Sequence, residues 1–183
     1  MAVRVSMTQL ISQVRSLIGD VDIPQQFNDQ VIQDVLDLNR DKFLGLALKT
    51  DTSLLTGLAD NTAWYSDYAN WEADTVLKDL ADAALTPSNP APQLGMWEFA
   101  TAQTNGVYAY GNTYDVYAAA ADLLDQWASA ESGVVDFSAD GMSVKRSTAG
   151  QGRRITANYL RSRSRKGGGA IKSMKLVRND INA

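Results

Sequence analysis

Residues 113–128 read TYDVYAAAADLLDQWA, and their apolar side chains recur at the spacing of an α-helix. The helix is expected to start at Asn112 or Thr113 and to end near Gly133. Its apolar stripe consists of Tyr117, Ala120, Ala121, Leu124, Trp127 and Ala128. Because alanine side chains are small, a second helix can approach this stripe closely. The stretch therefore predicts a fold built by helix packing.

Two amphipathic helices are predicted before this stretch. The first starts at Ser6, which can form a capping box with Gln9, and it ends at Gly19, as helices with a C′ glycine do. The second starts at Asn28, which acts as its N-cap, and its apolar stripe continues to about Leu48.

A hairpin and a last helix are predicted after the central stretch. Residues 135–144 alternate apolar and polar side chains around a turn signal at Asp140-Gly141. The last helix opens at Ser147 or Thr148, and the glycines at 167–169 end regular structure because of their backbone freedom. The apolar residues of this helix are Ile155, Ala157, Tyr159 and Leu160, and its basic face consists of Arg153, Arg154 and Arg161.

Residues 51–113 differ from the helical segments because Gly, Asn, Thr and Pro are scattered among many aromatic side chains. The stretch is too long for an ordinary loop, so we expect an insertion with a small structure of its own. Within it, the apolar pattern at 76–84 predicts a short helix. Asn105-Gly106 predicts a hairpin between residues 96–102 and 107–110.

The aromatic residues of this insertion allow three interpretations. We favour packing of the insertion onto the helices, and a partner surface or stacking of nucleotide bases are the alternatives. The segment has one basic residue, Lys78, against 8 acidic ones, so repulsion from phosphate disfavours nucleic acid there. The candidate partner surface consists of Trp64, Trp71, Trp97, Phe99, Tyr108 and Tyr110.

The sequence as a whole predicts a mainly α fold. We expect a small helical bundle with a β-hairpin, a long aromatic-rich insertion and an extended C-terminal tail. One helical domain would cover residues 1–166, with the insertion at about 51–113, and a flexible docking tail would cover 167–183. No apolar run approaches the roughly 20 residues needed to cross a bilayer. We therefore expect a soluble protein with no membrane partner.

Composition argues against most catalytic classes. The chain has 183 residues with no cysteine and no histidine, which excludes thiol nucleophiles, zinc ribbons and Ser-His arrangements. Asp20 and Asp22 form a D-x-D pair that could hold a divalent cation, but a turn after a helix is the favoured interpretation. We likewise interpret Asp34, Asp37 and Asp41 as a solvated acidic face rather than a metal site. We expect no catalysis, no cofactor and no metal.

The two ends of the chain carry opposite charge. Residues 1–140 contain 6 Lys or Arg against 20 Asp or Glu, whereas residues 141–183 contain 11 against 1. The basic end is favoured as a docking segment for an acidic protein surface. Nucleic-acid contact and a solvated helix end are the alternatives. The candidate docking residues are Arg161, Arg163, Arg165, Lys166, Ile171, Lys172, Met174, Lys175, Leu176 and Val177.

Several stretches together resemble a known family. They are VRSLIGD at 14–20, FND at 27–29, YDVYAAAADLL at 114–124, VDFS at 135–138 and GMSV at 141–144, followed by an Arg-rich helix. In this order and spacing they resemble head-to-tail adaptor proteins of tailed bacteriophages, also called connector or head-completion proteins. The resemblance covers about 110 residues at the two ends. It does not include the aromatic insertion or the tail beyond Gly167.

The resemblance implies a structural protein of the virion neck, made in the host cytoplasm. Such proteins form a homo-oligomeric ring, usually of twelve copies, beneath the portal of the DNA-filled head. The ring extends the DNA channel used in genome ejection and gives the stopper or tail a platform. The resemblance also implies that the C-terminal segment clasps the portal protein. An acidic lumen suits this role, because DNA must pass without sequence-specific or tight binding.

Overall fold

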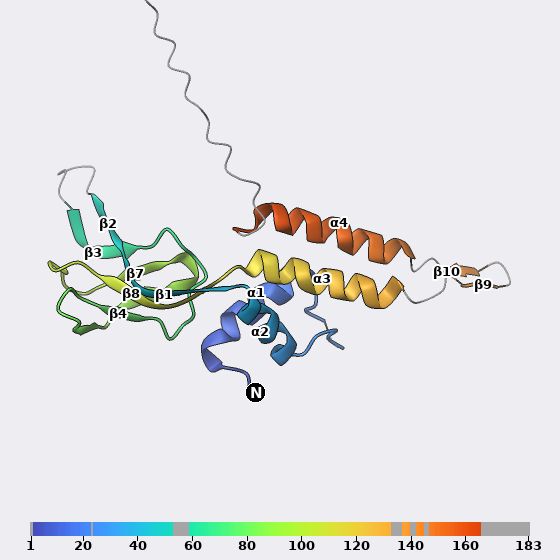
Figure 1. Cartoon of the computed structure of the whole chain (residues 1–183), viewed down its shortest axis with the longest axis horizontal. Helices are drawn as coiled ribbons and strands as arrows, with labels where there is room; N and C mark the ends of the chain where they lie inside the picture. The colour runs from blue at the N-terminus through green and yellow to red at the C-terminus, as the bar shows by residue number, and fades with distance from the viewer. Residues whose placement is uncertain are drawn as a thin grey trace, which may run out of the picture.

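The computed structural model describes residues 2–22, 24–52, 59–132, 137–139, 142–144 and 147–165 of the chain. Its elements form two units, a helical unit and a β unit, which lie side by side along the long axis (Figure 1). The helical unit contains the short 3-10 helix η1 and four α-helices. Their bounds are η1 Val5–Met7, α1 Thr8–Ile18, α2 Asp29–Leu38, α3 Val116–Ser132 and α4 Ser147–Arg163.

The β unit consists of two antiparallel sheets that pack face to face. The first sheet has the strand order β1-β8-β4-β5, and the second has the order β2-β3-β7-β6. Leu77 and Ala109 of the first sheet and Trp64 and Trp97 of the second sheet share one buried cluster between them. The strands are β1 Arg40–Ala47, β2 Lys49–Thr52, β3 Ala59–Tyr65, β4 Val76–Lys78, β5 Ala84–Leu85, β6 Asn89–Ala91, β7 Met96–Glu98 and β8 Tyr108–Tyr114. The short 3-10 helix η2, Pro92–Leu94, precedes β7.

The expectation of a mainly α fold is therefore wrong, since the protein is a mixed α and β structure. The largest error concerns the second helix, which ends at Leu38 instead of Leu48. The Asn39 side chain donates to the Val35 carbonyl at 3.1 Å, and the chain then becomes strand β1. Strand β1 pairs with β8 along its whole length, and these long-range backbone bonds outweigh a weak helical pattern.

A glycine inside β1 marks the irregularity in this strand. Gly45 has φ of +100°, and the register with β8 shifts between Leu44 and Leu46. This is the behaviour of a β-bulge, for which glycine suits the backbone. Because Asp41 lies on β1, it does not share a helical face with Asp34 and Asp37.

Two local predictions within the β unit are also wrong. The expected helix at 76–84 is a hairpin of β4 and β5. Its turn is held by the Asp79 carboxylate, which accepts from the backbone N–H groups of Ala81 and Ala83, each at 2.9 Å. The expected hairpin around Asn105-Gly106 does not form either, because β7 pairs with β3 and β6 whereas β8 pairs with β1 and β4.

The helical unit is layered around α3, which contacts α1, α2 and α4. The predicted central helix is confirmed, although it starts at Val116 because Asp115 caps it by accepting from the Ala118 N–H at 3.0 Å. Its small residues allow the close approach that the sequence predicted. Gly150 of α4 faces Ala128, where an added Cβ would lie 3.4 Å from the Ala128 carbonyl oxygen.

The predicted ends of α1 and α2 are partly confirmed. Gly19 ends α1 in the left-handed conformation with φ of +72°, and Asn28 caps α2 by accepting from the Val31 N–H at 2.9 Å. The capping box is wrong, because Ser6 Oγ donates to the Glu72 carboxylate at 2.7 Å instead of capping the helix.

The last two elements follow the order that the sequence predicted. Strands β9, Phe137–Ala139, and β10, Met142–Val144, pair antiparallel, so the hairpin is confirmed. Helix α4 begins at Ser147, as predicted. Val135 and the turn at Asp140-Gly141 lie outside the described residues, as does the docking tail at 167–183.

The β unit occupies a wider stretch of the chain than the insertion expected at about 51–113. The chain leaves the helical unit at Asn39 and returns at Asp115. The Asp115 N–H donates to the Asn39 carbonyl at 2.9 Å, so the two crossing points are in contact. The described residues between 40 and 114 therefore form the β unit, which joins the helical unit through this pair of adjacent strands, β1 and β8.

Candidate interaction surfaces

Asp20, the first residue of the D-x-D pair, has a structural role. The Asp20 carboxylate is buried and accepts from Arg15 at 2.9 Å and from the backbone N–H groups of Gln26 and Phe27 at 2.6 and 3.1 Å. These contacts fix the turn between α1 and α2. Within the described part of the chain, no group of three or more carboxylates is placed to hold a metal ion.

A buried carboxylate, Glu72, lies where the β unit meets the helical unit. Its side chain is 2% exposed. It accepts from Tyr114 Oη at 2.6 Å, Ser6 Oγ at 2.7 Å, Arg4 Nε at 2.9 Å and Asn112 Nδ2 at 3.2 Å. These donors come from the N-terminal segment and from β8, so one side chain joins segments of both units.

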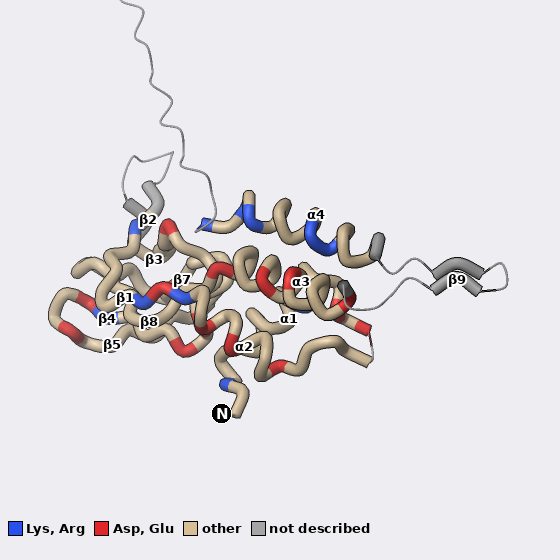
Figure 2. The backbone as a smooth tube through the Cα atoms, turned by 45° about the vertical axis from the view of Figure 1, so that its right-hand side comes forward, with Lys and Arg blue, Asp and Glu red and all other residues tan. Residues whose placement is uncertain are grey.

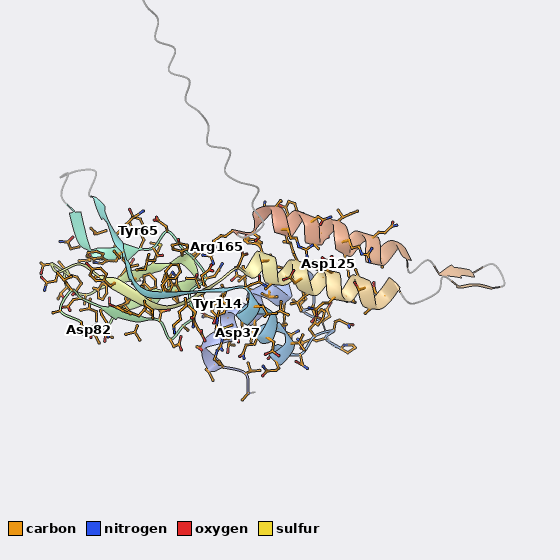
Figure 3. All side chains as sticks on the ribbon, viewed as in Figure 1. Asp37, Tyr65, Asp82, Tyr114, Asp125 and Arg165 are labelled. Atoms are coloured by element: carbon orange, nitrogen blue, oxygen red, sulfur yellow. The ribbon has the colours of Figure 1, made fainter. Side chains whose placement is uncertain are left out.

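Arg4 extends this junction cluster to α2. Its guanidinium donates to the Asp37 carboxylate at 2.6 and 3.1 Å and to Tyr114 Oη at 3.0 Å. Figure 3 shows Asp37 and Tyr114 near each other at the boundary of the two units. We use the name junction cluster for Arg4, Ser6, Asp37, Glu72, Asn112 and Tyr114.

Charges and hydrogen bonds in the junction cluster change its pKa values. Burial would raise the pKa of Glu72, but hydrogen bonds from Tyr114, Ser6 and Asn112 and the charge of Arg4 lower it below the usual value. Burial and the hydrogen bond to Glu72 raise the pKa of Tyr114. The hydrogen bond to Asp37 raises the pKa of Arg4. The cluster therefore holds Glu72 ionised and Tyr114 protonated at neutral pH.

The stability of the protein is expected to depend on pH through Glu72. Because the pKa of Glu72 is lower in the folded chain, the unfolded chain binds more protons in a window that opens just above the ordinary glutamate pKa and extends down through the folded pKa. The free energy of unfolding should therefore fall as pH is lowered through this window. Urea unfolding at several pH values measures the effect.

Asp74 lies beside Glu72 and must be separated from it in this measurement. Desolvation and the Glu72 charge raise the pKa of Asp74, so its contribution has the opposite sign. Comparing Asp74→Asn with the double variant Glu72→Gln/Asp74→Asn removes this contribution from both proteins. Equal pH slopes for the two variants would contradict the role of Glu72.

Two arginines of α4, Arg153 and Arg161, bind to the neighbouring helix α3. Arg161 pairs with Asp125 at 2.6 Å and with Asp122 at 3.1 Å, and the hydrogen bond to Asp125 raises its pKa. Arg153 pairs with Glu131, and its guanidinium lies 3.9 Å from the centre of the Trp127 ring. Figure 2 shows acidic residues of α3 beside basic residues of α4.

The last described arginines lie at the end of α4 near the β unit. Arg165 lies 5.4 Å from the centre of the Tyr68 ring and 3.9 Å from the Asp41 carboxylate, and it approaches Thr113 Oγ1 at 3.4 Å. Arg163 lies 4.8 Å from the centre of the Tyr159 ring. A shallow hollow of about 200 Å³ lies here, lined by residues that include Asp67, Asn70, Asp115, Tyr117, Arg163 and Arg165.

The predicted docking residues are therefore divided. Arg161 and Arg165 contact their own chain, and Arg163 is exposed beside Tyr159. Arg161 is thus not a free docking cation, because the acidic side of α3 supplies its partners. Lys166 and the tail residues Ile171, Lys172, Met174, Lys175, Leu176 and Val177 lie outside the described residues.

The aromatic residues proposed for a partner surface lie mainly inside the β unit. Trp64, Trp71, Trp97 and Phe99 are buried in the cluster between the sheets, so these four side chains cannot form a partner surface. Their size and apolar character explain the burial, as they fill the space that two small sheets leave. Tyr108 and Tyr110 are half-buried.

No protein-family model, curated protein or solved structure matches the chain. Among the residues that the structure describes, no helix is long and apolar enough to span a membrane.

The junction cluster could not be predicted from the sequence. Its members lie at positions 4, 6, 37, 72, 112 and 114, so no local spacing connects them. The ion pairs between α3 and α4 could be predicted in part, because α3 contains acidic residues and α4 contains basic residues. Asp122 pairs with Arg161 late in α4, and Glu131 pairs with Arg153 early in α4, which is the order expected for antiparallel helices.

Proposed function

We propose that this chain is a structural subunit of a phage neck ring, which joins the portal of a DNA-filled head to the stopper or tail. In this role the ring extends the DNA channel, and the chain has no catalytic task. The protein would act in the virion after synthesis in the host cytoplasm.

The observation that carries the proposal is the order of the helical elements. Helices α1 and α2, then α3, the β9–β10 hairpin and the Arg-rich α4 follow in the order of the stretches that resemble phage adaptors. The β unit is inserted between α2 and α3, and its first strand, β1, pairs with its last strand, β8. The helical unit can therefore keep the arrangement of a simple adaptor while the β unit offers a separate surface to stopper, tail or neighbouring copies.

The charge distribution supports the same role. The N-terminal 140 residues, which include all of the β unit and α1 to α3, carry 20 acidic residues against 6 basic ones. An acidic channel wall keeps contacts with DNA phosphates weak, so DNA can slide during ejection. The basic end of the chain is free of this constraint if it points away from the lumen toward the portal.

The alternative, a nucleic-acid-binding module that uses the Arg-rich helix, is less well supported. Arg161 lies between Asp122 and Asp125, and Arg153 is held by Glu131. A phosphate group approaching these arginines would meet the carboxylates that already neutralise them. We therefore assign the basic end to protein docking.

Attachment to heads tests the proposed function. DNA-filled, portal-bearing heads of the phage that encodes the chain, prepared without it, are expected to bind the full chain in a sedimentation assay. Deletion of 167–183 should abolish attachment while helix content by circular dichroism stays nearly unchanged, because the described helices end at Arg163. The control is empty heads assembled without portal protein. Equal binding of the deleted chain would contradict portal docking by the tail, and no binding of the full chain would contradict the neck role.

A further inference from the structure

Helix α4 has a second face that turns away from its own subunit. Ala157 and Leu160 are buried toward α3. On the opposite side, Ile155 is 71% exposed and Tyr159 is 53% exposed. Gly152 lies one turn before Ile155 and two turns before Tyr159, and a Cβ built there would meet nothing within 4 Å. We call Gly152, Ile155, Tyr159 and the adjacent Arg163 the α4 ridge.

Helix α2 has a complementary outer face on the far side of the same unit. Ile32 and Leu36 face the core, whereas Asp34 is exposed and Leu38 is 81% exposed. Helix α3 contacts both α2 and α4 and separates them (Figure 1). The α4 ridge and the α2 face therefore point in opposite directions.

The charges of these two faces also match. The α4 ridge carries Arg163 and the α2 face carries Asp34, both exposed. Of the other charged residues on these helices, Arg153, Arg161, Asp29 and Asp37 form ion pairs within their own chain. Arg163 stacks on Tyr159, so a cation lies beside the apolar part of the ridge. On α2, Asp34 lies one turn before Leu38, so a carboxylate lies beside the exposed leucine.

We infer that the α4 ridge of one copy docks on the α2 face of the next copy. Ile155 and Tyr159 pack against Leu38, and Arg163 lies near Asp34. The inference rests on the proposed function in that it names the contact between neighbours in the neck ring. Because the two faces differ and lie on opposite sides of one unit, the contact is heterologous and repeats from copy to copy, as ring formation requires.

Charge and shape favour a second copy of this chain as the partner that binds to the α4 ridge. Another acidic protein could attract the arginines, but the α2 face of the same chain offers both a carboxylate and an exposed leucine. Gly152 lets a neighbouring helix come close to the α4 backbone. A small contact of this kind is weak in a pair of free chains and gains strength when it is repeated around a closed ring.

Cysteine cross-linking tests the contact, because the full chain contains no cysteine of its own. The double variant Leu38→Cys/Ile155→Cys, treated with a short bismaleimide at high protein concentration, is expected to give a ladder of covalent oligomers. An equal mixture of the two single variants should stop at dimers, because each chain then carries one thiol. Either single variant alone should remain monomeric.

The matched control is Leu94→Cys/Ile155→Cys, which places one thiol on another exposed leucine in the β unit. A ladder no stronger than that of the control would overturn the inference. Dimers formed by one single variant alone would also overturn it, because they show a symmetric contact. Circular dichroism of each variant shows whether it is folded, and the substituted side chains are exposed enough to leave the core intact.

Head attachment separates this inference from the proposed function. A ladder without attachment to portal-bearing heads would contradict the neck role and support the contact. Attachment without a ladder, with the double variant seated on heads, would contradict the contact and support the neck role.

Discussion

Replacing Glu72 by alanine is expected to lower the free energy of unfolding by about 2–4 kcal/mol, because two hydroxyl groups lose their acceptor at roughly 1–3 kcal/mol each while Arg4 keeps its ion pair with Asp37. The Glu72 carboxylate is 2% exposed and accepts from four side chains. Without it, the hydroxyl groups of Ser6 and Tyr114 lose their acceptor in a region that water does not reach freely. Urea unfolding at pH 7 measures the loss.

Two spectroscopic signals can show whether Glu72 couples the two units. Trp64, Trp71 and Trp97 lie in the β unit, whereas Trp127 alone lies on α3, so tryptophan fluorescence reports mainly on the β unit. Far-ultraviolet circular dichroism reports mainly on the helices. We expect the two unfolding curves to coincide in the original protein and to separate in Glu72→Ala.

Asp34→Ala is the matched control for this prediction. Asp34 is an exposed carboxylate on α2 whose side chain accepts from Gln30. Its removal should change the free energy of unfolding by no more than about 0.5 kcal/mol. A loss below about 1 kcal/mol in Glu72→Ala, with coincident curves, would show that the junction cluster does not hold the units together.

Replacing Trp71 by alanine is expected to destabilise the β unit by about 3–5 kcal/mol, as for other large aromatic side chains in cores. Trp71 is fully buried, and its ring centre lies 5.3 Å from that of Phe43 and 5.7 Å from that of Trp97. Its Nε1 also donates to the Tyr68 carbonyl at 2.9 Å. The substitution removes a hydrogen bond and leaves a cavity between the sheets.

Because Glu72 still joins the two units in Trp71→Ala, its fluorescence-monitored and helical unfolding curves should shift together to lower urea concentration. Leu94→Ala, which shortens an exposed leucine of the same unit, is the control and should have little effect. A shift in Trp71→Ala no larger than that of Leu94→Ala would show that the buried aromatic cluster does not stabilise the protein.

The elements that the sequence predicted correctly carry their signals locally. Gly19, Asn28 and the apolar stripe of residues 113–128 each lie next to the structure they determine. Strand β1 could not be found in this way, because its pairing partner β8 lies more than sixty residues further along the chain. The apolar residues of β1 continued the helical spacing of α2, so the sequence predicted a longer helix. The bulge at Gly45 became visible only in the structure.

The candidate surfaces could likewise be predicted only where their signals are local in the sequence. The positive charge of α4 could be read from the sequence, but its partners on α3 required the antiparallel packing of the two helices. The favoured interpretation packed the aromatic residues onto the helices, and it is wrong for Trp64, Trp71 and Trp97, which are buried between the two sheets of the β unit. Glu72 could not be predicted, because its donors come from segments that meet only in the folded chain.

The arginines of the basic end differ in their contacts, because only some of them form ion pairs with α3. Arg153 and Arg161 hold α4 on its own subunit. Arg163 is exposed beside Tyr159, and we assign it to the proposed contact with a neighbouring copy. We propose portal docking for residues 167–183, so their deletion is expected to spare the fold and abolish attachment.

We propose that this chain forms part of a neck beneath the portal. Electron microscopy of portal-bearing heads, imaged before and after incubation with the full chain, can detect such a neck. We expect added density that encircles the channel at the portal vertex, and no added density when the chain lacks 167–183. Heads that stay unchanged at that vertex, or chain bound elsewhere on the capsid, would contradict the account.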